Sequence, residues 1–205
     1  MTQHKNITAI ILAGGKSSRM GEEKGLVLFK EKPLVLYVIA AAKEITDNII
    51  IITANPAYQQ FSCRCIEDAL KDKGPLGGIY TGLINSGTQK NLLLGCDMPF
   101  LTGNLLRALA ARCGEEDVLL TEHNGLAEPL CSVYDNRSAA AFRDLLEQDQ
   151  LKITDALAGL KTRVISFDKE DWFRGNEFAN INTIEELNKL RDGNTDDTDR
   201  AEVHG

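Results

Sequence analysis

Apolar runs and helix-like stretches alternate through the first half of the chain. Four short runs are apolar at nearly every position, which is typical of parallel strands that are buried on both faces. We predict these strands at residues 7–12, 48–53, 63–66 and 91–95. The apolar spacing at 33–43 and 75–85, with a proline at an early position of each, favours helices. This alternation predicts parallel strands joined by right-handed crossovers.

The second half has a less regular pattern. Residues 137–148 form the clearest amphipathic helix, because Ala141, Phe142, Leu145 and Leu146 recur on one face. A final helix is expected to begin at Thr183, where Thr-x-x-Glu forms a capping box. We predict helices at 102–112, 137–148 and 183–190, and strands at 117–121, 129–134 and 163–167, of which 129–134 is a candidate for antiparallel pairing.

Together these elements predict an α/β protein with a three-layer α/β/α sandwich. Its Rossmann-like sheet is expected to be mostly parallel, with a mixed C-terminal part. The chain has 205 residues and no long linker, so we expect a single domain spanning 1–190. Residues 191–205 are polar and acidic with almost no apolar anchors, which predicts a disordered tail.

Composition narrows the class of protein. A content of 43% hydrophobic and 26% charged residues is that of an ordinary globular protein, and no apolar run approaches the roughly 18 residues that span a bilayer. The net charge of −7 argues against a nucleic-acid partner. Residues 1–6 lack a basic segment followed by an apolar one, so we expect no secretory signal, no membrane partner and a cytoplasmic location.

The cysteines do not form a disulfide framework. There are five of them, an odd number, and their spacing is not that of a framework. Cys63 and Cys65 resemble half of a metal site, but no second pair or nearby histidine completes it. We therefore expect free thiols.

The segment 12–24, Leu-Ala-Gly-Gly-Lys-Ser-Ser-Arg-Met-Gly-Glu-Glu-Lys, directly follows the first predicted strand. Its glycines let the backbone turn sharply and approach a ligand closely. Backbone N–H groups and a few cations on a loop that leaves a strand suit a polyphosphate, and Lys16, Arg19 and Lys24 supply the cations. The spacing is neither that of a P-loop nor Gly-x-Gly-x-x-Gly.

This loop resembles the signature loop of the nucleotidyltransferases that activate sugars and cofactors. Four later stretches, at 66–68, 74–78, 96–99 and 180–183, fall in the order seen in the molybdenum cofactor guanylyltransferases. The first motif alone would indicate only the superfamily, whereas the set and the short length indicate the cofactor branch. The resemblance covers residues 7 to about 190, nearly the whole chain.

The resemblance implies a magnesium-dependent transfer of GMP from GTP to molybdopterin cofactor, with release of pyrophosphate. GTP and the pterin would be the substrates, and a molybdoenzyme or a cofactor-delivery protein is an open choice of partner. Three alternatives remain: a cytidylyltransferase for the same pterin, a sugar-phosphate nucleotidyltransferase, and a non-catalytic nucleotide-binding protein that delivers cofactor. Lys24 and Asp97 argue against the last, because a pure binder would not need both.

Arg19, Lys24 and Asp97 are the candidate catalytic residues. Arg19 can form a bidentate pair with phosphate oxygens, and a salt bridge to Glu22 or Glu23 is the simpler alternative. The resemblance gives Lys24 the neutralisation of phosphate. Asp97 ends a central strand, where an unpaired carboxylate is costly to bury, so it either caps the next segment or holds Mg²⁺. The resemblance also assigns the metal to this position.

The remaining candidates come from the ends of other strands. We expect nucleotide contacts from the strand-end loops, and the resemblance adds Asp68, whose plain alternative is a turn or helix cap. The family that the chain resembles commonly has an asparagine after the second strand, which contacts the guanine nucleotide. This chain has Thr53 there, so the residue for the guanine-specific contact departs from the family pattern. The nucleotide-binding candidates are Leu12, Ala13, Gly14, Gly15, Lys24, Thr53, Asp68, Gly77 and Asp97, and those for the pterin are Glu128, Asn180 and Asn182.

Overall fold

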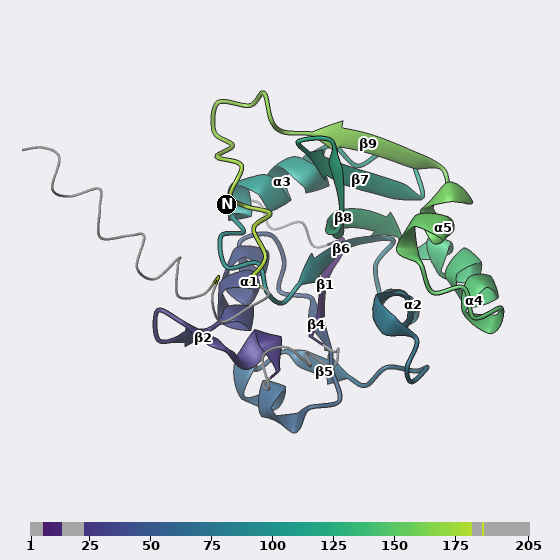
Figure 1. Ribbon diagram of the computed structural model, residues 1–205, viewed down its shortest axis with the longest axis horizontal. Coiled ribbons are helices and arrows are strands. Elements are labelled where there is room, and N and C mark those ends of the chain that lie inside the picture. The colour runs from purple at the N-terminus through teal and green to yellow at the C-terminus, as the bar shows by residue number, and fades with distance from the viewer. Residues whose placement is uncertain (1–5, 14–22, 182–185, 187–205) are drawn as a thin grey trace, which may run out of the picture.

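The computed structural model describes residues 6–13, 23–181 and 186, and it forms one seven-stranded sheet with helices on both faces (Figure 1). The strand order is β5-β4-β1-β6-β8-β7-β9. The strands are β1 (Ile7–Leu12), β4 (Ile49–Ile52), β5 (Arg64–Ile66), β6 (Lys90–Gly95), β7 (Val118–His123), β8 (Leu126–Asp135) and β9 (Thr162–Ser166). The helices are α1 (Leu34–Lys43), α2 (Gly74–Asn85), α3 (Gly103–Ala111), α4 (Ala139–Glu147) and α5 (Ile153–Ala158).

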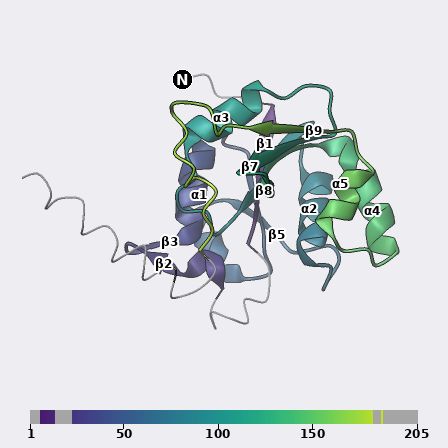
Figure 2. The same cartoon turned by 45° about the horizontal axis from the view of Figure 1, so that its top comes forward.

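Helices cover the sheet from two sides, as expected for a three-layer sandwich. Figure 2 shows α1 and α3 on one face and α2, α4 and α5 on the other. Each central strand supplies both layers: Ile11 lies in the core under α1 and α3, whereas Ile10 lies in the core under α2 and α4. Both side chains are fully buried, which explains why β1 is apolar at every position except Thr8.

The first half of the sheet is parallel. β1 pairs in parallel with β4 and β6, and β4 pairs in parallel with β5. α2 crosses close to β1 at Gly82. A side chain there would place its Cβ 2.4 Å from Cγ2 of Ile10, so only glycine allows this approach. The four predicted strands and the two predicted helices of this half are confirmed within one or two residues.

The second half contains the mixed part of the sheet. β8 runs antiparallel to both β6 and β7, which confirms the antiparallel candidate, and β9 runs parallel to β7. The turn between β7 and β8 is Asn124-Gly125, with both residues at positive φ, as a two-residue hairpin requires. In α4, Phe142 and Leu146 are buried, as the amphipathic pattern predicted.

Several short elements were not predicted. A hairpin of two-residue strands, β2 (Leu28–Phe29) and β3 (Lys32–Pro33), precedes α1. Helix α5 and three 3₁₀ segments, η1 (Lys24–Leu26), η2 (Pro56–Phe61) and η3 (Asn136–Ser138), were also missed. Strands of two residues and helices of a turn or two carry too few positions for a hydrophobic period to be visible.

Two expectations fall largely outside the described residues. Of the final helix at 183–190 only Glu186 is described, and it is helical; the tail at 191–205 is not described. Within the described part of the chain, the five cysteines are free thiols, and Cys96 and Cys131 are buried. None of the described helices is both long and apolar enough to cross a membrane.

Candidate functional site

The carboxyl ends of β1, β4, β5 and β6 lie along one edge of the sheet. Because these strands are parallel neighbours, the segments after them share that edge, as the sequence predicted. Leu12 and Ala13 lie at the end of β1: the Ala13 N–H donates to the Ile52 carbonyl at 3.1 Å, and the Leu12 carbonyl accepts from Cys96 N at 3.3 Å. The candidates Gly14, Gly15 and Arg19 lie outside the described residues.

Lys24 and Asp97 form an ion pair at this edge. Lys24 begins η1 and Asp97 follows β6, and the Lys24 Nζ lies 3.0 Å from Oδ2 of Asp97. Their side chains are 29% and 16% exposed, so the pair is shielded but still open to a ligand. A side chain at Gly95 would place its Cβ 2.8 Å from the other Asp97 oxygen, so glycine there leaves room for the carboxylate. The two predicted catalytic residues that are described therefore meet.

The chemistry of Asp97 suits a cation that keeps most of its own ligands. No group of three or more His, Cys, Asp or Glu side chains in the described residues is placed to hold a metal ion. Mg²⁺ commonly uses only one or two protein carboxylates, with substrate phosphates and waters supplying the rest. The partly exposed Asp97, with one oxygen beside Lys24, fits that kind of site.

Glu23 accepts hydrogen bonds from two residues after β4, Thr53 and Asn55, of which Thr53 was expected to contact the base. The Thr53 hydroxyl donates to Oε1 of Glu23 at 3.3 Å, and the Asn55 amide donates to its Oε2. The other end of the Asn55 side chain accepts from Ala57 N at 2.9 Å and caps η2. Sequence reasoning considered Glu23 only as a partner of Arg19 and so missed this bridge, which ties the segment before Lys24 to the loop after β4.

Asp68 is held by helix α2. Its Oδ1 accepts from the Thr81 hydroxyl at 3.0 Å, and that hydroxyl also accepts from Ala69 N at 3.0 Å. Burial raises the pKa of Asp68, while the Thr81 hydrogen bond lowers it. A side chain at Gly77 would place its Cβ 2.9 Å from the Lys73 Cβ, so glycine at this position relieves a clash in the first turn of α2. Asp68 does not cap α2, since Lys73 is the residue at its N-cap.

A register shift between β7 and β8 lies beside the segment that contains Glu128. Thr121 pairs with Glu128 and Leu119 pairs with Val133, so only Leu120 of β7 faces residues 129–132 of β8. Because Leu94 is the last residue of β6 paired with β8, residues 128–130 extend past that pairing, toward the segment that carries Asp97. Such bulges are common beside active sites. Burial raises the pKa of Glu128, and His123 lowers it.

Asn180 approaches the same edge from the other end of the chain. The Ile181 N–H donates to the Asp97 carbonyl at 3.0 Å, and the Ile181 side chain is fully buried with Phe29 and Leu34. Asn180 itself is exposed, and the segment is not a strand. Asn182 lies outside the described residues.

His123 and Asp168 form a cluster that the sequence did not suggest. The His123 Nδ1 lies 2.6 Å from Oδ1 of Asp168, whose other oxygen accepts from Asn124 N at 3.0 Å. The imidazole packs against Phe173 and Phe178 at centroid distances of 5.3 and 5.6 Å. His123 and Asp168 are 45 positions apart in the sequence, with no motif around either, and the fold brings them together.

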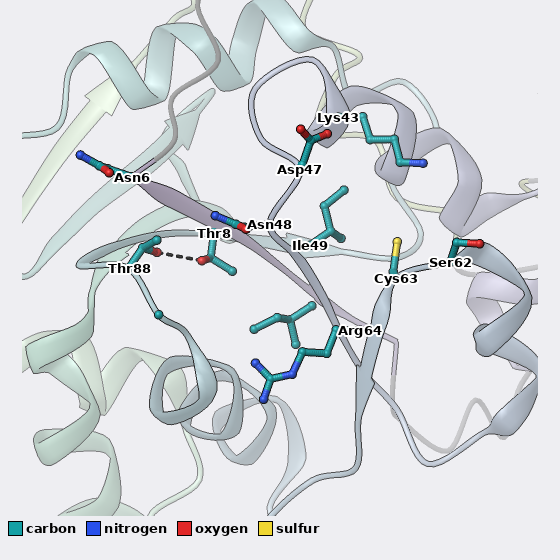
Figure 3. A pocket seen from close by; sticks show the side chains of 12 residues that line it. Asn6, Thr8, Lys43, Asp47, Asn48, Ile49, Ser62, Cys63, Arg64 and Thr88 are labelled. Atoms are coloured by element: carbon teal, nitrogen blue, oxygen red, sulfur yellow. Dashed lines mark hydrogen bonds between the residues drawn. The ribbon is translucent and has the colours of Figure 1, made fainter.

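A separate hollow of about 540 Å³ lies at the opposite edge of the sheet (Figure 3). Its lining includes Thr8 and Thr88, joined by a 2.8 Å hydrogen bond, and Arg64, which donates to the Asn85 carbonyl at 3.0 Å. None of the predicted site residues that the structure describes lines this hollow. It therefore does not belong to the site built from the carboxyl ends of the strands.

Comparison with known proteins shows the family of the chain. The family model described as "MobA-like NTP transferase domain" matches residues 9–162. A probable molybdenum cofactor guanylyltransferase from Flavobacterium johnsoniae is 38% identical, with 91% of this chain and 97% of the relative covered. A molybdenum cofactor guanylyltransferase from Vibrio atlanticus is 34% identical, with 88% and 93% covered.

The fold is also that of a solved structure. The crystal structure of molybdopterin-guanine dinucleotide biosynthesis protein A from Archaeoglobus fulgidus has a TM-score of 0.75 at 24% identity, and the match covers 90% of this chain and 97% of that one. The family match extends over most of the strands that form the site. The chain therefore belongs to the family of MobA-like NTP transferase domains.

Proposed function

We propose that this chain is a nucleotidyltransferase that moves GMP from GTP to molybdopterin cofactor and releases pyrophosphate. The observation that carries the proposal is the Lys24–Asp97 pair at 3.0 Å, at the edge where the glycine-rich segment leaves β1. The names of the relatives at 38% and 34% identity support guanine as the base and the molybdenum cofactor as the acceptor.

In the proposed reaction, a terminal phosphate oxygen of the pterin attacks the α-phosphorus of GTP. The new P–O bond forms as the bond to pyrophosphate breaks, so no covalent enzyme intermediate is needed. Lys24, Arg19 and the backbone N–H groups of the loop would bind the phosphates and hold them in line. Asp97 would hold Mg²⁺, which when bound supplies positive charge to the phosphate oxygens.

We assign the other candidates to the two substrates. Thr53, Asp68 and Gly77 would contact the nucleoside, with Glu23 orienting Thr53 through the hydrogen bond at 3.3 Å. Glu128, Asn180 and Asn182 would contact the pterin, supported by the bulge in β8 and by the hydrogen bond between Ile181 and the Asp97 carbonyl. We further propose one catalytic domain over residues 1–190 that acts in the cytoplasm, where free thiols persist.

A nucleotide panel tests this proposal. The melting temperature of the protein is measured with Mg²⁺ and each of GTP, CTP, ATP and UTP, and pyrophosphate release is then followed with and without molybdopterin. We expect GTP to give the largest stabilisation, and pyrophosphate release to require both GTP and the pterin. Preference for CTP would show that the base is cytosine and not guanine. Turnover with a sugar phosphate in place of the pterin would overturn the proposed acceptor. Binding of GTP without any turnover would favour a delivery protein.

A further inference from the structure

Tyr58 presents an unexplained buried hydroxyl. The residue lies in η2, after β4, and its side chain is fully buried. Across the described residues, its Oη is the only buried side-chain nitrogen or oxygen without a hydrogen-bond partner. Leaving a buried hydroxyl unpaired is costly, so such a group in a folded protein calls for an explanation.

The hydroxyl lies directly against the turn that contains Lys24. A Cβ built on Gly25 would be only 2.4 Å from the Tyr58 Oη and 3.2 Å from its Cζ. The same Cβ would be 3.2 Å from the Cβ of Cys96, the residue before Asp97. The phenol therefore lies where the turns of Lys24 and of Asp97 approach each other, and only glycine at position 25 allows that approach.

The phenol stays protonated in this position. Burial raises the pKa of Tyr58 well above its usual value of 10, and the neighbouring Cys96 and Glu23 raise it further. The Gly25 backbone N–H lowers the pKa, but burial outweighs it. Tyr58 can therefore accept a hydrogen bond from this turn or donate one to it, but it cannot act as a base.

A second set of contacts joins the same two segments. Glu23, on the other side of Lys24, accepts hydrogen bonds from Thr53 and Asn55, and Asn55 caps the helix that carries Tyr58. Lys24 is thus flanked by one residue tied to the loop after β4 and by another that rests on the Tyr58 hydroxyl. The segment 53–58 consequently sets the position of the Lys24 backbone.

We propose that Tyr58 is a positioning residue for the nucleotide loop. Its close packing against Gly25 positions that backbone, so that the Lys24 ammonium is held beside Asp97, and the hydroxyl forms a hydrogen bond with this turn when the triphosphate is bound. The proposal rests on the proposed function for the identity of the ligand, but the contact between Tyr58 and Gly25 is independent of which nucleotide binds.

The test compares Tyr58→Phe with a matched control, Tyr37→Phe. Each variant loses one hydroxyl, but the Tyr37 hydroxyl donates to the Phe29 carbonyl at 2.7 Å, away from the ion pair. We expect Tyr37→Phe to lower the melting temperature and leave turnover unchanged. Tyr58→Phe should leave the melting temperature unchanged or raise it, because it removes an unpaired polar group. It should nevertheless lower kcat/KM by about 10-fold, the size expected for one oriented hydrogen bond.

Two further measurements distinguish a positioning role from a structural one. Amide hydrogen exchange over residues 23–26, without ligand, should be faster in Tyr58→Phe and unchanged in Tyr37→Phe, whose lost hydrogen bond is to Phe29. Affinity for the triphosphate should fall while affinity for the nucleoside is kept, because Lys24 is displaced and the base contacts are not. The nucleotide used is the one that most stabilises the wild type, so that a preference for CTP would contradict the proposed function while the Tyr58 comparison continues with CTP. Wild-type exchange and wild-type kcat/KM in Tyr58→Phe would overturn the role given to Tyr58.

Discussion

Lys24 and Asp97 are separated by 73 positions in the sequence and meet because β1 and β6 are neighbours in the sheet. The backbone makes room for both: Gly25 rests on the Tyr58 hydroxyl and Gly95 leaves space for the Asp97 carboxylate. An ion pair this close to the surface contributes little to stability by itself. In the proposed reaction, the pair presents one positive and one negative group to a triphosphate and its cation.

Lys24→Ala is expected to weaken the binding of GTP much more than that of guanosine. The loss of a charge-assisted contact of about 1.5–3 kcal/mol corresponds to roughly 10- to 100-fold in the dissociation constant. Calorimetric titration of both ligands measures the difference. Lys90→Ala is the matched control, because Lys90 forms an ion pair of the same length, 3.0 Å, with Asp135 at the other end of β6. Equal losses for GTP and guanosine in Lys24→Ala would show that the lysine is structural.

The sequence was sufficient for the residues that end strands and not for those that act through tertiary contacts. Lys24 and Asp97 were predicted at one edge because the segments after parallel strands meet there, and the resemblance supplied the role of Lys24 and supported that of Asp97. Glu23 and Tyr58 were missed because a glutamate in a polar loop resembles a solvated residue, and a tyrosine in an irregular segment resembles an ordinary core residue. Their roles depend on the distance between the loops after β1 and β4, which no local pattern contains.

At the scale of elements, β9 is fastened to the sheet edge by a buried carboxylate. Glu116, whose side chain is 7% exposed, accepts from the Arg163 guanidinium at 3.0 and 3.3 Å and from Gly114 N at 2.8 Å. Burial raises the pKa of Glu116, but these hydrogen bonds outweigh burial and bring the pKa down to about 2. The carboxylate therefore stabilises the fold only while it is ionised.

Glu116→Gln is expected to lower the free energy of unfolding at pH 7 by about 1–2 kcal/mol, a figure reduced because Arg163 is partly exposed to solvent. A depressed pKa contributes stability above the unfolded value of 4.5, and that contribution disappears as the pH falls toward 2. Urea titrations between pH 7 and pH 2 should show the two proteins converging over that range. Glu115→Gln, at the exposed neighbouring position, should follow the wild type at every pH. A constant difference between Glu116→Gln and wild type down to pH 2 would contradict the role of the ionised carboxylate.

Elements with a long apolar period were predicted, and those defined by a few backbone angles were not. The parallel strands and α1 to α4 were found because burial on both faces, or on one helical face, leaves a clear pattern. The bulge between Leu119 and Thr121 leaves no such pattern in the sequence. There the Ser132 hydroxyl accepts a hydrogen bond from Thr121 N at 2.9 Å and donates one to the Glu128 carbonyl at 2.7 Å. That bulge also sets the position of Glu128 opposite Thr121.

At the scale of the whole molecule, the two edges of the sheet carry different chemistry. One edge gathers Lys24, Asp97, Asp68 and Glu128, whereas the other carries the hollow around Thr8 and Arg64. The chain has a net charge of −7, so anionic substrates must be drawn by local positive groups rather than by the overall field. The central claim is that catalysis belongs to the first edge alone, through Asp97 and the cation it holds.

Asp97→Asn, compared with Asp135→Asn, tests that claim most directly. Both carboxylates pair with a lysine at 3.0 Å, but Asp135 is 2% exposed at the amino end of β6, where it also accepts from Gln89 at 3.0 Å and from Arg137 N at 3.1 Å. Asparagine keeps the size of the side chain and loses the charge that a hard dication requires.

We predict that Asp97→Asn melts near the wild-type temperature, still binds GTP without magnesium, and releases pyrophosphate about 100- to 1,000-fold more slowly in the presence of magnesium. Asp135→Asn should melt at a lower temperature and keep the wild-type rate per folded molecule. The measurement is magnesium-dependent pyrophosphate release from GTP and molybdopterin by the three proteins side by side. A near wild-type rate in Asp97→Asn would contradict the metal site at the carboxyl edge and the mechanism built on it.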